Sequence, residues 1–134
     1  RELEEFFTRL TDGISGAETL EDLLVRTVVV ATQDLRHDDH LALMLASEPG
    51  ETLAQLTVDG LPRIIRMASL FLAPFVEPYL GRVAAAHLVE VLARLVISYF
   101  LAPSDLVDLG DTESARRFVQ THVLPAFPVS PAHH

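Results

Sequence analysis

The sequence RVAAAHLVEVLARLVISYFLA, at residues 82–102, is the most informative stretch of the chain because it is apolar on almost every side of a helix. Its polar residues form one narrow stripe, made of His87, Glu90, Arg94 and Ser98. An ordinary surface helix buries one face and exposes the other, so a helix this apolar needs cover on two sides. Two arrangements give that cover, and both stay open: a central helix inside one chain, or a helix between its own core and a partner. The charges within this stretch argue against a transmembrane span.

The composition bounds the class of protein. The chain has 134 residues, which fits one domain, and 49% of them are hydrophobic, enough for a sizeable core. The formal charge is −9 and all 10 basic residues are arginine. Because affinity for phosphate backbones comes largely from basic contacts, these residues are not expected to hold DNA. The chain has no cysteine, no signal peptide and no uncharged run long enough to span a bilayer, so we expect a cytoplasmic protein without membrane contact.

Apolar residues recur three and four positions apart along most of the chain, which predicts an all-α domain. A sandwich or barrel would need many short alternating strands. We expect an orthogonal or antiparallel bundle of about six helices within a domain at residues 1–127, followed by a flexible tail at 128–134. The helical segments are expected at residues 2–10, 20–36, 41–47, 51–58, 62–77, 82–102 and 111–127.

Polar residues and prolines predict where these helices begin and end. Side chains that cap helix N-termini are expected at Thr19, at Asp38 or Asp39, and at Asp111. Pro74 is expected to kink the helix that starts near residue 62, and Pro78 to end it near Glu77.

No set of residues points to catalysis. The turn formed by His37, Asp38, Asp39 and His40, with Glu48 nearby, carries imidazole and carboxylate groups that suit a divalent metal. Short polar clusters between helices are usually loops, so we expect no metal site there. No Gly-rich phosphate loop, Walker-type motif or recognisable nucleophile–base pair is present. We therefore expect neither an enzyme nor a bound cofactor.

The polar stripe of the helix at 82–102 could face solvent, a subunit interface or a ligand cavity. Glu90 and Arg94 are four residues apart, which favours an ion pair along the helix. Ala86, Ala93 and Ile97 flank the stripe, and small side chains there would let a second helix approach closely. Elsewhere, methionine and phenylalanine side chains are candidate cavity liners, although they could equally fill the core. These are Phe6, Phe7, Met44, Met67, Phe71 and Phe75.

The order and spacing of four strings resemble the C-terminal regulatory domain of the tetracycline-repressor (TetR) family of bacterial transcription regulators. The strings are HLALMLASEP at 40–49, FLAP at 71–74, LARLVIS at 92–98 and RFVQTHVLPAF at 117–127, and the resemblance spans residues 2–127. Members of that family carry an N-terminal helix-turn-helix, which is absent here, and a helical C-terminal domain that forms a homodimer and binds a small molecule. The resemblance thus implies that residues 1–12 are the remnant of a helix linking the two domains. The chain also does not begin with Met, which suggests a missing N-terminal portion.

The resemblance also implies roles for individual residues. The helices at 82–102 and 111–127 would form a four-helix interface in the dimer, and a small apolar or aromatic effector would bind in a cavity and alter operator binding by the absent domain. Candidate interface residues are Ala86, Glu90, Ala93, Ile97, Phe118, Val119, His122 and Val123. Candidate ligand contacts are Phe7, Thr27, Ala31, Met44, Met67, Phe71, His87, Val91 and Arg94. The alternatives are a stand-alone dimeric helical module that binds an apolar ligand or a protein without DNA, and an enzyme with a metal at His37 and His40.

Overall fold

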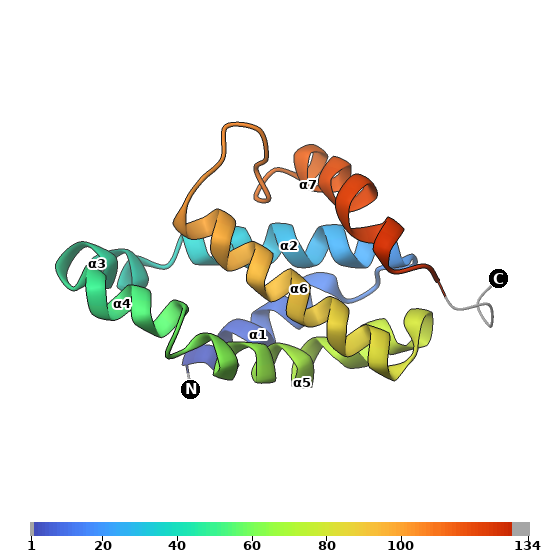
Figure 1. Ribbon diagram of the computed structural model, residues 1–134, viewed down its shortest axis with the longest axis horizontal. Coiled ribbons are helices and arrows are strands. Elements are labelled where there is room, and N and C mark those ends of the chain that lie inside the picture. Colours follow the sequence, from blue (N-terminus) through green and yellow to red (C-terminus); the bar gives the residue numbers. More distant parts are fainter. Residues whose placement is uncertain (1, 130–134) are drawn as a thin grey trace.

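The computed structural model describes residues 2–129, which fold into seven α-helices followed by two short helical turns (Figure 1). No strand occurs in this part of the chain, so the predicted all-α bundle is confirmed. The α-helices are α1 (Glu2–Ile14), α2 (Leu20–Arg36), α3 (Asp39–Ser47), α4 (Pro49–Leu56), α5 (Leu61–Leu80), α6 (Arg82–Leu101) and α7 (Thr112–Phe118). A π-helical turn, η1 (Val119–Val123), and a 3-10 turn, η2 (Leu124–Ala126), follow α7.

Helices α5 and α6 form the most extensive contact of the fold, and α2 packs against α1, α6 and α7. Figure 1 shows α6 crossing over α2 and α5, with α3 and α4 projecting at one end of the molecule and α7 lying across α2. The largest fully buried side chains come from α1, α2, α6, η1 and the segment before α7. They include Ile14, Leu24, Leu88, Leu109, Val25, Val28 and Val119. The core therefore joins the two ends of the chain.

The three predicted N-terminal caps are confirmed. The Thr19 hydroxyl accepts a hydrogen bond from the N–H of Asp22 at 3.1 Å. Asp38 accepts one from the N–H of Leu41 at 2.9 Å, and Asp111 accepts one from the N–H of Ser114, also at 2.9 Å. Each bond satisfies a backbone donor that the first turn of a helix leaves without a partner.

The predicted end of α5 near Glu77 is wrong, because the helix continues through Pro74 and Pro78 to Leu80. A proline inside a helix removes one backbone hydrogen bond and crowds the carbonyl four residues earlier. Both prolines are on the exposed side of α5, and Leu70 is 70% exposed, so water can solvate the carbonyls that lose a donor. The helix ends at Gly81, whose φ of 82° is in the left-handed region that favours glycine.

Other boundaries also differ from the prediction. Helix α1 extends four residues beyond Leu10, to Ile14. The single helix expected at 111–127 is instead α7 followed by η1 and η2, which contains Pro125, a residue that has no backbone N–H to donate. The flexible tail expected at 128–134 lies outside the described residues from 130 onward.

Helix α6 has cover from its own chain on one side. It contributes Ala85, Leu88, Val89, Leu92, Val96 and Ile97 to the buried residues. On its other side Val83 is 86% exposed, and Ala86, His87 and Arg94 are also exposed. By length and composition alone α6 could cross a membrane, since its mean hydropathy reaches 1.6, but the core helix of a soluble protein passes the same test.

Candidate ligand-binding cavity

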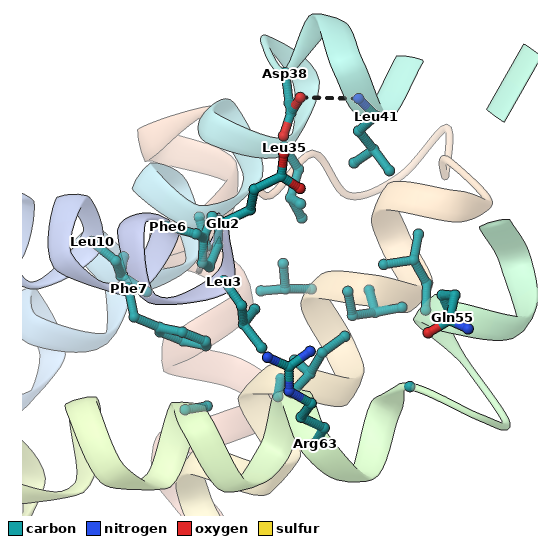
Figure 2. A pocket seen from close by; sticks show the side chains of 18 of the residues that line it. Glu2, Leu3, Phe6, Phe7, Leu10, Leu35, Asp38, Leu41, Gln55 and Arg63 are labelled. Carbon is teal, nitrogen blue, oxygen red and sulfur yellow. Dashed lines mark hydrogen bonds between the residues drawn. The ribbon is translucent and has the colours of Figure 1, made fainter. Parts of the chain in front are cut away.

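A cavity of about 660 Å³ lies among α1, α2, α3, α4, α5 and α6 (Figure 2). This volume is within the range of roughly 300–1,000 Å³ that is usual for small-molecule sites. Helices α1, α2, α5 and α6 provide the deeper, apolar wall, whereas α3 and α4 line the projecting end of the molecule. The elements that form the core therefore also shape the cavity.

Small side chains keep this space open on three helices. Ala31 of α2, Ala68 of α5 and Ala93 of α6 all line the cavity. Ala31 and Ala68 are 5% and 2% exposed, so they are among the buried residues of the core as well. A longer side chain at any of these positions would occupy volume that the cavity now provides.

The two phenylalanines of α1 form an aromatic part of the wall. Phe6 and Phe7 both line the cavity, and their rings meet edge to face with centroids 5.1 Å apart. The ring of Phe7 also stacks on that of Phe71 at 5.6 Å. Phe71 does not itself line the cavity, so it supports the orientation of Phe7 from behind.

Helices α3 and α4 cover the other end of the cavity with partly polar residues. Thr52 is 4% exposed, and its hydroxyl lies 2.7 Å from the carbonyl of Glu48 and 3.1 Å from that of Met44. This hydroxyl therefore joins the two helices and is already hydrogen-bonded. Helix α3 contributes no buried residue, so it covers the cavity without belonging to the core.

Charged residues are distributed unevenly around the cavity. Figure 2 shows Glu2 and Asp38 on one side and Arg63 of α5 on the opposite side. One oxygen of Asp38 is engaged with the start of α3, as described above. His40, Glu51 and Gln55 are further polar liners, and all three are exposed. The cavity thus combines an apolar interior with a charged rim.

Four of the nine predicted ligand contacts line the cavity, and they are Phe7, Thr27, Ala31 and Met44. The other five, Met67, Phe71, His87, Val91 and Arg94, do not. His87 and Arg94 are on the exposed side of α6, where the ring of His87 meets that of Phe127 at 5.3 Å. Arg94 forms the ion pair expected with Glu90, at 3.1 Å. The polar stripe of α6 therefore faces away from the cavity.

The residues predicted to form a dimer interface fall into three groups, which lie in the core, along the cavity and on the surface. Phe118, Val119 and Val123 are buried in the core of the single chain, so in this conformation they have no surface to offer a second copy. The ring of Phe118 packs against Tyr99 of α6 at 5.6 Å. Ala93 and Ile97 line the cavity instead. Of the eight predicted residues, Ala86, Glu90 and His122 remain on the surface.

The turn at residues 37–40 is engaged in local hydrogen bonds. His37 Nδ1 lies 2.7 Å from the carbonyl of Gln33, and Asp38 caps α3. Within residues 2–129 no three His, Cys, Asp or Glu side chains come together as metal ligands would.

Most of the liners were not predicted from the sequence, among them the polar residues Arg63, Gln55 and Thr52. A signal for the cavity was present in α5 and the residue before it, because Gly60, Ile64, Ala68 and Leu72 follow one another at intervals of four and all line the cavity. A helix face that alternates small and large apolar residues leaves room beside the small ones. No comparable signal identified Arg63.

Comparison with protein-family models, curated protein sequences and solved structures finds no match to this chain.

Proposed function

We propose that this chain is the ligand-sensing and dimerisation domain of a bacterial TetR-type transcription regulator, and that its cavity binds a small, largely apolar effector. The observation that carries the proposal is the cavity of about 660 Å³, which has apolar walls from four helices and a charged rim. The four strings at residues 40–127 that resemble the TetR family support the assignment to a regulator. Binding of operator DNA would belong to a helix-turn-helix ahead of residue 1.

The position of α1 offers a mechanism for this regulation. Leu3, Phe6, Phe7 and Leu10 line the cavity, so a bound ligand would touch the helix nearest to the preceding residues of the parent protein. A ligand shifts an equilibrium between two states only if it binds one state more tightly. An effector that favours one position of α1 would therefore favour one arrangement of the DNA-binding domains that α1 joins.

Binding of a neutral apolar probe tests the cavity assignment. We expect decanol to bind the chain in isothermal titration calorimetry with one site per chain. The variant Ala93→Phe should weaken this binding by at least about tenfold, because the larger side chain fills space next to the bound molecule. Ala42→Phe is the matched control, since Ala42 is exposed on α3 and does not line the cavity.

Two results would refute the cavity assignment. One is a chain that binds no decanol although it is folded. The other is an Ala93→Phe variant that binds decanol as tightly as the Ala42→Phe control. Circular dichroism melting of each variant distinguishes lost binding from lost folding.

The alternative function is a stand-alone dimeric helical module that carries an apolar ligand or binds a protein without DNA. The formal charge of −9 favours this alternative, because an acidic chain is not suited to phosphate backbones by itself. Both functions use the same cavity, so ligand binding does not separate them. The residues ahead of residue 1 in the parent polypeptide do: a basic helix-turn-helix there supports the regulator, and its absence supports the module.

A further inference from the structure

Arg63 lines the cavity without an ionic partner, and we propose that it binds the carboxylate of a ligand whose apolar body fills the cavity. The ligand would be a monocarboxylate with an aliphatic or aromatic body. This inference rests on the proposed function, because it presupposes that the cavity binds a small molecule, and it narrows that molecule to one chemical class.

Arg63 combines two features that bear on ligand binding: it lines the cavity and it forms no ion pair within residues 2–129. Acidic residues outnumber basic ones by 19 to 10, and four of the nine arginines in this range form ion pairs. Arg9, Arg36, Arg94 and Arg116 each form an ion pair at 2.6–3.1 Å. Arg63 forms none with any residue in 2–129, and of the arginines in that range it is the one that lines the cavity.

The geometry places the positive charge where a ligand could meet it. Figure 2 shows the guanidinium group of Arg63 turned from the first turn of α5 toward the cavity, with Glu2 and Asp38 on the opposite side. From Arg63 the same helix continues past Ile64, Ala68 and Leu72, which are apolar liners. A ligand lying along α5 would therefore have its charged end at Arg63 and its apolar body among these residues.

The chemistry of the guanidinium group favours a carboxylate. Its planar donors match the two oxygens of a carboxylate and can form two parallel hydrogen bonds. Because Arg63 is exposed at the rim, the charged end of the ligand keeps part of its hydration while the body leaves water. This division lets an amphipathic molecule bind without burying an uncompensated charge.

The acidic residues at the rim limit the ligand to one negative charge. Glu2, Asp38 and Glu51 all line the cavity, and a second anionic group near them would be repelled. A dicarboxylate whose second group reaches the side of Glu2 and Asp38 should therefore bind less well than a monocarboxylate of the same length.

Three ten-carbon probes that differ only in their head group test the inference. Decanoate, decanol and decylamine are titrated by calorimetry near neutral pH, below the concentrations at which the two charged probes form micelles and decanol separates from water. We expect decanoate to bind most tightly. Arg63→Gln should weaken decanoate binding by about tenfold and change decanol binding by less than about twofold, because only the charged head group loses its hydrogen bonds. Arg63→Lys, which keeps the charge but not the paired donors, should restore part of the loss.

The control variant is Arg66→Gln. Arg66 is also exposed on α5 but does not line the cavity, so this change should leave the affinities for all three probes unchanged. If decanoate and decanol bind equally and Arg63→Gln affects neither, the proposed function stands and this inference fails. If decylamine binds most tightly, the inference also fails, in favour of a cationic ligand. If the folded chain binds none of the probes, both the inference and the proposed function fail.

Discussion

Asp108 joins the segment before α7 to α2 through hydrogen bonds to a single carboxylate oxygen. Arg36 Nη2 donates to Oδ1 of Asp108 at 2.6 Å, and the N–H of Gly110 donates to the same oxygen at 2.9 Å. The hydrogen bond from Arg36, with a smaller contribution from that of Gly110, holds the pKa of Asp108 below its ordinary value of 3.8. Because the folded-state pKa is lowered, this carboxylate stabilises the fold above its unfolded pKa and loses that effect as the pH falls through the folded value.

The variant Asp108→Asn should therefore destabilise the protein in a pH-dependent way. Near neutral pH we expect its melting temperature to fall by a few degrees at most, since exposed ion pairs contribute only about 0–1 kcal/mol. As the pH drops below about 4, the melting curves of wild type and variant should converge, because both then lack the charge. Asp105→Asn is the control, because Asp105 is exposed in the same segment and forms no ion pair with any residue in 2–129. A difference in melting temperature that stays constant down to about pH 2 would contradict this account.

Features that depend on neighbouring residues could be predicted from the sequence, and those that depend on helix rotation could not. Thr19, Asp38 and Asp111 were recognisable as caps because capping involves a residue and the next turn. The Glu90–Arg94 ion pair was recognisable for the same reason. Whether that polar stripe faces a cavity or water depends on the rotation of α6 about its own axis. No local pattern in the sequence specifies this rotation.

Among the helices, α6 is the one for which the sequence did not show whether its own chain or a partner covers both sides. In the structure its own chain covers one side. Its exposed side carries Val83, Ala86, His87 and Arg94. The same two alternatives apply to Phe118, Val119 and Val123, which were expected at an interface and are buried within the single chain. An apolar residue needs cover, but its type does not reveal whether the cover comes from its own chain. In this fold α7 and η1 cover part of the core themselves.

As part of the proposed function, a second copy of the chain should cover the exposed side of α6. We expect sedimentation analysis to give a mass about twice the 14.8 kDa of one chain. Ala86→Arg should shift the equilibrium to monomers, because it places a bulky charge where two helices would meet. Ala42→Arg, at an exposed position on α3, should leave the mass unchanged. A wild-type chain that stays monomeric at high protein concentration would contradict the dimer.

Helix boundaries could also be predicted only in part from local sequence patterns. The bounds of α2 agree with its apolar periodicity, in spite of three consecutive valines that favour strands. Helix α5 continues through two prolines, although a proline inside a helix ordinarily predicts a kink or an end. It can do so because both prolines are on its exposed side. A rule for proline needs to know which carbonyl faces water, and that is a property of the packed molecule.

For the whole molecule, the cavity is the feature that local patterns could not supply, because six helices contribute to it. The liners Phe7, Thr27, Ala31 and Met44 were predicted, and they come from three helices, α1, α2 and α3. Their residue types suited a binding site, and the resemblance to a ligand-sensing family suggested which segments to combine. The side of the cavity that carries Arg63 was missed, since an arginine in the first turn of a helix is ordinarily a solvated surface residue.

Titration of the methyl-labelled chain with decanol, followed by NMR, shows whether a ligand enters the cavity. The account predicts saturable shifts, and contacts to the probe, at methyl groups that line the cavity, including those of Met44, Leu72 and Val96. No change is expected at Leu106, which is 91% exposed and does not line the cavity. Shifts confined to exposed methyl groups such as that of Leu106, or no saturable shifts at all, would contradict a ligand-binding cavity among α1–α6.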